Sequence, residues 1–179
     1  CKMITTKTWY DKKFKEGKLM SLISKEGANI AFDDIIEYAI ENEQRSHDMY
    51  MRLSRRVKEK DIKDFFIQMA QEELSHENKL EQVLLWGPGS FHVDRVSDID
   101  IGRTKEVRKI SRDSTFEEAL YFAITKENES YELYKALAKA AKHPNVKDHF
   151  VKLSRLEMEH RNRLKAIYKK YFEKEVVLQ

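Results

Sequence analysis

Four long segments of the chain repeat apolar residues with the 3.6-residue period of an amphipathic helix. We predict helices over residues 32–57, 61–86, 116–141 and 144–172. The links from the first helix to the second and from the third to the fourth are short. Each of these pairs is therefore expected to form an antiparallel hairpin.

Local signals mark several of the predicted helix ends. Thr115 and Glu118 have the spacing of a capping box at the start of the third helix. Pro144 suits the first position of the fourth helix, where a missing backbone N–H breaks no hydrogen bond. The Trp-Gly-Pro-Gly run at 86–89 ends the second helix.

The two predicted hairpins are copies of one pattern. An offset of 84 residues aligns them without an insertion, and we call residues 84 positions apart repeat partners. A long segment, about 87–114, separates the copies and can run the full height of a bundle. One such crossover between two hairpins is the connectivity of ferritin-like folds. Repeat partners include Phe32 and Phe116, Ala39 and Ala123, Glu43 and Glu127, Tyr50 and Tyr134, Phe66 and Phe150, and Leu80 and Leu164.

These observations together predict the fold class and the domain organisation. We expect an all-α protein, a ferritin-like antiparallel four-helix bundle built from two repeated hairpins joined by a long crossover. The bundle should occupy residues 31–175, and residues 1–30 should form an N-terminal extension.

A glutamate lies at the centre of the apolar stripe of each predicted helix. On a helical wheel with about 100° per residue, Ile36, Ala39 and Tyr50 fall within about 40° of Glu43. Glu41 points to the opposite side and is expected in solvent. The same construction turns one glutamate inward on every helix, and on two helices a histidine three residues further along shares its face. The six inward polar residues are Glu43, Glu73, His76, Glu127, Glu157 and His160.

Four buried carboxylates at one level require compensation, because each uncompensated buried charge costs at least several kcal/mol. Either the carboxylates take up protons or cations neutralise them. Two divalent cations balance four glutamates, and four carboxylates with two imidazoles suit iron or manganese. A single Glu-x-x-His is a weak signal. The combination in register on four helices matches the general pattern of di-metal carboxylate bundles.

Composition narrows the classes of partner. The chain has 34 Lys and Arg against 31 Asp and Glu, a net charge of +3, so we expect neither nucleic acid nor a membrane as its partner. One cysteine allows no internal disulfide framework and no four-cysteine metal site. The cysteine content fits a reducing compartment, and we predict a cytoplasmic protein.

The inward residues resemble those of the rubrerythrin-like branch of the ferritin-like superfamily over about residues 30–173. The matching elements are Glu43 with Tyr50, Glu73-Leu-Ser-His76, Glu127 with Tyr134, and Glu157-Met-Glu-His160. The resemblance implies two metal ions, foremost iron, with manganese or zinc as alternatives. Glu73 and Glu157 would bridge the ions. Glu43, Glu127, His76 and His160 would be terminal ligands. Tyr50 and Tyr134 would hydrogen-bond the ligand carboxylates, with ordinary core packing as the alternative.

The resemblance also implies an activity. It predicts an oxidoreductase, active in oxidative stress, that reduces hydrogen peroxide or dioxygen at a carboxylate-bridged di-iron pair. Rubrerythrins proper carry a rubredoxin-like module with four cysteines, whereas this sequence has one. We therefore expect an external, rubredoxin-like electron-donor protein, and from the family a homodimer. Two alternatives stay open: iron sequestration of ferroxidase type without peroxidase turnover, and a purely structural role for the cluster.

Other polar residues lie beside the inward faces. His47 and its repeat partner Tyr131 are close to the ligand faces, where His47 could transfer protons, join the metal ligands or hydrogen-bond in the interior. Glu77 and its repeat partner Arg161 are predicted to form an ion pair across the bundle. The histidines expected at the surface or at helix edges are His92, His143 and His149.

Overall fold

Four long helices make up most of the part of the chain that the computed structural model describes, which is residues 32–85, 114–141 and 143–173. They are α3 (Phe32–Arg56), α4 (Lys60–Leu85), α5 (Phe116–Ala140) and α6 (Pro144–Phe172). The described residues contain no β-strand. Each observed helix end lies within one residue of its predicted position, so the reading of the apolar period is confirmed.

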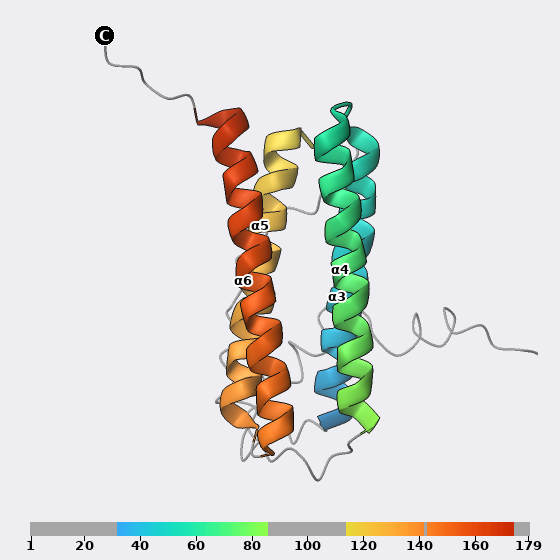
Figure 1. Ribbon diagram of the computed structural model, residues 1–179, viewed down its shortest axis with the longest axis vertical. Helices are drawn as coiled ribbons and strands as arrows, with labels where there is room; N and C mark the ends of the chain where they lie inside the picture. The colour runs from blue at the N-terminus through green and yellow to red at the C-terminus, as the bar shows by residue number, and fades with distance from the viewer. Residues whose placement is uncertain (1–31, 86–113, 142, 174–179) are drawn as a thin grey trace, which may run out of the picture.

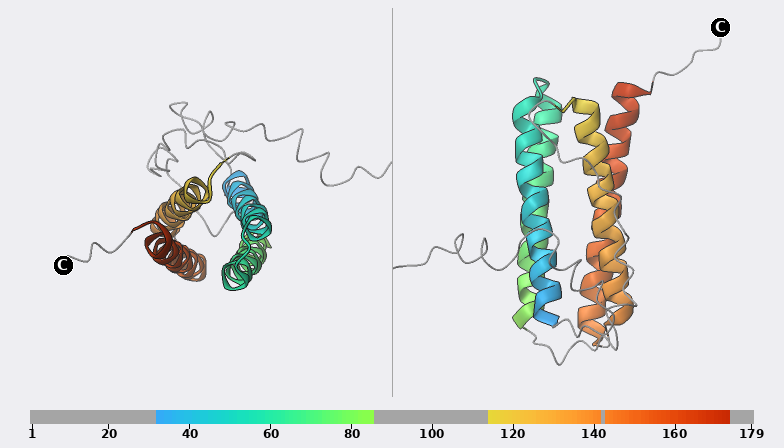
Figure 2. Two further views of the ribbon diagram at one scale, coloured as in Figure 1. Left: turned by 90° about the horizontal axis from the view of Figure 1, so that it is seen from above. Right: turned by 180° about the vertical axis from the view of Figure 1, so that it is seen from behind.

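The helices are arranged as two hairpins that stand side by side (Figure 1). α3 runs antiparallel to α4, and α5 runs antiparallel to α6. Viewed along the bundle, α3 lies next to α5 and α4 lies next to α6 (Figure 2). α4 ends at the opposite end of the bundle from the start of α5. The predicted all-α bundle of two hairpins is confirmed.

The predicted signals at the helix ends of the second hairpin are present. The Thr115 hydroxyl accepts a hydrogen bond from the Glu118 backbone N–H at 3.1 Å, and the Glu118 carboxylate accepts one from the Thr115 N–H at 2.8 Å. Pro144 follows the N-cap residue His143 as the first residue of α6. The Trp-Gly-Pro-Gly run, the N-terminal extension, His92 and most of the crossover lie outside the described residues.

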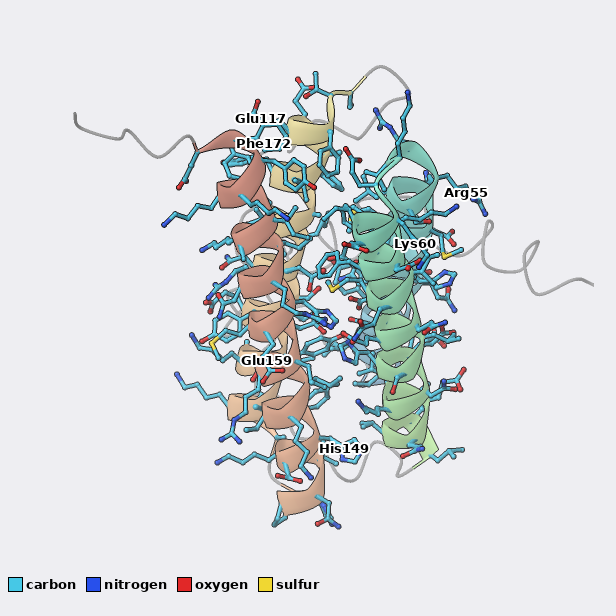
Figure 3. The ribbon with its side chains drawn as sticks, turned by 45° about the horizontal axis from the view of Figure 1, so that its top comes forward. Arg55, Lys60, Glu117, His149, Glu159 and Phe172 are labelled. Atoms are coloured by element: carbon cyan, nitrogen blue, oxygen red, sulfur yellow. The ribbon has the colours of Figure 1, made fainter. Side chains whose placement is uncertain are left out.

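The core consists of two apolar clusters, one toward each end of the bundle, and side chains fill the space between the hairpins (Figure 3). Repeat partners fall into opposite clusters, so the two hairpins are related by an approximate two-fold rotation. Tyr50 stacks on Phe66 with ring centroids 6.1 Å apart, and Tyr134 stacks on Phe150 at 6.3 Å. The cluster where α3 begins includes Ile36, Ala39, Leu80, Tyr134, Phe150 and Leu153. The other includes Tyr50, Leu53, Phe66, Met69, Leu120 and Leu164.

None of the four described helices contains a stretch that is both long enough and apolar enough to cross a bilayer.

Candidate metal centre

The six predicted inward residues meet at one level of the bundle, between the two apolar clusters. We call them the Glu/His cluster. Each is at most 2% exposed. The hydrophobic residues above and below them on each helix fix this depth, because rotating any helix to free its glutamate would expose its apolar stripe. The cluster consists of Glu43 on α3, Glu73 and His76 on α4, Glu127 on α5, and Glu157 and His160 on α6.

The two histidines occupy equivalent positions with equivalent neighbours. His76 Nδ1 lies 2.8 Å from Glu157 Oε1 and 3.3 Å from Glu43 Oε2. His160 Nδ1 lies 2.8 Å from Glu73 Oε1 and 3.3 Å from Glu127 Oε2. The two imidazole rings stack with centroids 5.2 Å apart. Each hairpin therefore contributes the same half of the cluster.

The residues of the two Glu-x-x-His motifs are the most closely gathered. One ligand atom from each of Glu73, His76, Glu157 and His160 lies within 4.8 Å of all the others. Glu73 reaches both histidines, with Oε1 at 2.8 Å from His160 Nδ1 and Oε2 at 3.5 Å from His76 Nδ1. A carboxylate with one oxygen toward each half has the geometry needed to bridge two ions.

Several buried polar atoms of the cluster lack hydrogen-bond partners, which also fits a metal site. Seven of its buried nitrogen and oxygen atoms have no partner in hydrogen-bond geometry, although some lie within contact distance of each other. Buried polar atoms without partners are rare and need an explanation. Carboxylate oxygens and imidazole nitrogens that converge on one region supply the donors that iron and manganese prefer. The atoms are Glu43 Oε2, Glu73 Oε1, Glu73 Oε2, His76 Nδ1, Glu127 Oε2, Glu157 Oε1 and His160 Nδ1.

Without metal, the cluster must hold its charge with protons. Burial alone would lower the pKa of both histidines, but the surrounding carboxylates outweigh it and raise the pKa of His76 and of His160 to about 12. Burial, with the Glu127 carboxylate next, raises the pKa of Glu73 to about 8. Burial also raises the pKa of Glu157 well above its usual value. Burial alone would raise the pKa of Glu43, but the interaction with His76 outweighs it, and the pKa of Glu43 is lowered. Cations entering the cluster would displace these protons.

Two tyrosines tie the hairpins together at the edge of the cluster. The Tyr50 hydroxyl of α3 donates to Glu127 Oε1 of α5, and the Tyr134 hydroxyl of α5 donates to Glu43 Oε1 of α3. Burial and the neighbouring carboxylates raise the pKa of both phenols well above 10, so both remain protonated donors. In Glu43 and Glu127, Oε1 is thus engaged by a tyrosine, and Oε2 faces the histidine of the same hairpin.

The residues predicted beside the ligand faces do not enter the cluster. His47 is 36% exposed, and its Nδ1 lies 3.2 Å from the neighbouring Asp48 carboxylate. The Tyr131 ring lies under two cations, with Lys135 Nζ 4.9 Å and Arg161 Cζ 5.2 Å from its centroid.

The predicted ion pair between Glu77 and Arg161 does not form. Instead, Gln44 donates to the Glu77 carboxylate at 2.6 Å, and Arg161 donates to the Asn128 amide oxygen at 2.5 Å. Both hydrogen bonds connect the two helices of one hairpin at the same repeat position. The prediction was wrong because a partner on the adjacent helix is within reach, whereas the other residue lies on a different hairpin.

The residues predicted to lie at the surface are exposed only in part. Glu159, which neighbours His160 in the sequence, is exposed on α6 (Figure 3). His143 is exposed at the start of α6, and His149 is half-buried. Glu41 differs, since its side chain is only 11% exposed and pairs with Arg45 at 2.7 Å. The helical wheel correctly directs Glu41 away from the cluster, but it does not report what else covers that side.

A further carboxylate, which was not among the predicted site residues, lies next to the cluster. Glu72 Oε2 lies 2.7 Å from His160 Nε2, and Glu72 also pairs with Arg163. Interaction with His160 outweighs partial burial and, with Arg163, lowers the pKa of Glu72. A signal was present: Glu72 is adjacent to a predicted ligand, yet its repeat partner is Leu156, so the repeat breaks beside the site.

Comparisons with known proteins agree with this geometry. The model of the rubrerythrin family matches residues 34–89 and 118–179, a range that contains all six residues of the Glu/His cluster. No curated protein and no solved structure matches the chain. The family implies a site for two metal ions, typically iron, and the Glu/His cluster is the candidate for it. With its four-helix fold, its repeated hairpins and a family match over more than half of its length, the chain belongs to the rubrerythrin family.

Proposed function

We propose that the protein is a non-haem di-iron oxidoreductase that reduces hydrogen peroxide or dioxygen. The observation that carries this proposal is the convergence of seven unpartnered, buried nitrogen and oxygen atoms from the four helices. A buried cluster with this composition has few other stable explanations, because its negative charge requires either protons or cations.

The proposed ligands divide evenly between two ions. Glu43 and His76 of the first hairpin lie together and would be terminal ligands of one ion. Glu127 and His160 of the second hairpin would be terminal ligands of the other. Glu73 and Glu157 would bridge, which is supported by the reach of Glu73 toward both histidines.

When bound and reduced, an iron pair supplies two electrons, which with two protons convert one hydrogen peroxide molecule into two water molecules. The chain's own part is to position the ligands and to control water and protons. The apolar clusters on both sides of the ligands keep bulk water out. The Tyr50 hydroxyl donates a hydrogen bond to Glu127 Oε1, and the Tyr134 hydroxyl donates one to Glu43 Oε1, so that each Oε2 is directed inward.

The electrons would come from a redox site outside the bundle. The 179 residues contain one cysteine, so they cannot supply the four thiolates of a rubredoxin-type iron site. A small redox protein docking near the bundle would re-reduce the centre after each turnover.

The test is anaerobic loading with two equivalents of Fe²⁺, followed by stopped-flow mixing with hydrogen peroxide or with air-saturated buffer. We expect an absorbance change within seconds for at least one oxidant, and recovery of the reduced state on adding reduced rubredoxin. No oxidation within seconds by either oxidant would contradict an oxidoreductase role. Oxidation by dioxygen that no donor reverses would instead favour iron sequestration.

A further inference from the structure

The approximate two-fold symmetry of the Glu/His cluster ends just outside it. Inside the cluster, the two shortest Nδ1 contacts of each histidine agree: 2.8 and 2.8 Å for the cross-hairpin pairs, 3.3 and 3.3 Å for the pairs with the first helix of the same hairpin. Outside it, the two histidines have different environments. The difference arises at one pair of repeat partners, Glu72 and Leu156.

On the His160 side, a carboxylate contacts the ring nitrogen that faces away from the cluster. Glu72 Oε2 lies 2.7 Å from His160 Nε2. An ionised carboxylate can only accept, so Nε2 carries the hydrogen of this bond. That assignment leaves Nδ1, the nitrogen that faces Glu73 and Glu127, as the lone-pair donor when the ring is neutral.

Glu72 is itself held from several directions. Arg163 donates to both carboxylate oxygens, one of them at 3.3 Å, and Gln68 donates to Oε1 at 2.8 Å. The Arg163 guanidinium packs over the Phe65 ring at 5.7 Å and contacts Met69 Sδ at 3.0 Å. The carboxylate that contacts His160 is therefore fixed in orientation rather than free to swing into solvent.

Within the described helices, no carboxylate contacts the second ring nitrogen of His76. Every carboxylate that pairs with His76 in the described helices approaches Nδ1, at 2.8, 3.3 and 3.5 Å. The residue at the position equivalent to Glu72 is Leu156, which cannot accept a hydrogen bond. Arg163 is matched by Lys79.

We propose that Glu72 is a positioning residue for one metal position: it orients His160 through Nε2–H and makes the His160 half of the centre bind its ion more tightly than the His76 half. This inference rests on the proposed metal-binding function of the Glu/His cluster. A carboxylate behind a ligating histidine fixes the ring and its tautomer and increases its basicity, and loss of such a partner typically costs 10- to 100-fold in metal affinity. The two ions should then enter in two steps of unequal affinity.

The experiment is a calorimetric titration of the full-length, metal-free protein with Co²⁺, in parallel with its visible d–d absorption. We expect two binding steps whose Kd values differ by at least about 10-fold. The variant Glu72→Leu, which copies the other half, should weaken the tighter step by about 10- to 100-fold and change the weaker step little. Glu72→Gln keeps an acceptor oxygen and should recover part of that loss. Leu156→Glu should tighten the weaker step, because it restores the carboxylate on the His76 side.

The matched control is Glu159→Leu, which removes the same charge from an exposed position next to His160. It should leave both steps unchanged, and circular dichroism of each metal-free variant checks that the helices remain folded. Equal Kd values in the unmodified protein, an equal loss in both steps for Glu72→Leu, or no loss at all would overturn the inference. Failure of the unmodified protein to bind Co²⁺ would instead contradict the proposed function itself.

Discussion

The two hairpins carry the same residues on the faces that meet in the Glu/His cluster, but different residues behind those faces. Each contributes a buried glutamate from its first helix, a Glu-x-x-His motif from its second helix, and a tyrosine that donates to the opposite hairpin. Behind His160 lies a hydrogen-bonded group of Glu72, Arg163 and Gln68, whereas Leu156 occupies the position equivalent to Glu72. Repeat partners are therefore identical in the Glu/His cluster and differ at the position behind each histidine. The hairpins should therefore respond alike when their inner residues change and unlike when the outer ones do.

The largest expected effect comes from removing a proposed bridging carboxylate. Glu73→Ala and Glu157→Ala should each abolish stable binding of both ions, because each would remove a ligand shared by the two halves. Inductively coupled plasma mass spectrometry after gel filtration measures the metal that remains, with Glu159→Ala as the control. A variant that still retains two equivalents would contradict the bridging assignment and the equivalence of the two residues.

The second-largest expected effect is the loss of thermal stability when metal is removed. Binding at a free metal concentration of about 1,000 times Kd stabilises a fold by about 4 kcal/mol per ion. Since about 1 kcal/mol shifts Tm by roughly 2–4 °C in a domain of this size, chelation should lower Tm by at least about 10 °C. Differential scanning calorimetry of the loaded and stripped protein measures this shift. An unchanged Tm would indicate that metal does not hold the hairpins together.

The stripped protein should lose stability as pH rises. Folding raises the pKa of His76 and His160 from 6.5 to about 12, so their stabilising protonation is complete below pH 6.5 and is lost as pH approaches 12. Glu73, raised from 4.5 to about 8, acts in the same direction between those values. Urea titrations at pH 6 and pH 9 should show a lower free energy of unfolding at pH 9. The loaded protein should lose less, because cations replace these protons. An opposite slope for the stripped protein would contradict the assigned protonation.

Replacing the two tyrosines tests the symmetry of the inner residues. Tyr50→Phe and Tyr134→Phe each leave a buried glutamate oxygen without its donor, which costs about 1–3 kcal/mol. The two losses should be similar, as judged by urea unfolding of the loaded protein. Tyr168→Phe is the control, because its 2.8 Å hydrogen bond to Glu117 is exposed and should contribute less than about 0.5 kcal/mol. Losses that differ by more than about 1 kcal/mol would show that the tyrosines are not equivalent.

The smallest effect concerns a helix end far from the centre. Thr115→Ala removes the side-chain half of the capping box of α5 and should lower the free energy of unfolding by about 1 kcal/mol. Metal stoichiometry should remain unchanged. A loss of metal in this variant would show that metal binding depends on the N-terminal cap of α5, which contradicts this expectation.

The same contrast explains how much could be predicted from the sequence. The apolar period determines the direction of a side chain from its helix, so the helix bounds and the six inward residues were accessible. The repeat confirmed them, because it places Glu43 and Glu127 at matching positions. Direction alone does not determine the contact partner, which is why the Glu77–Arg161 pair was predicted wrongly. Glu72 was missed for a related reason, since a search for repeated residues passes over a position where the copies differ.

The central claim is that the Glu/His cluster holds two metal ions between the apolar halves of the bundle. Anomalous X-ray diffraction from crystals of the iron-loaded protein, collected on both sides of the iron absorption edge, tests it most directly. We predict two anomalous peaks about 3.5–4 Å apart, between the carboxylates of Glu73 and Glu157. A single peak, or iron located only outside the cluster, would contradict the account.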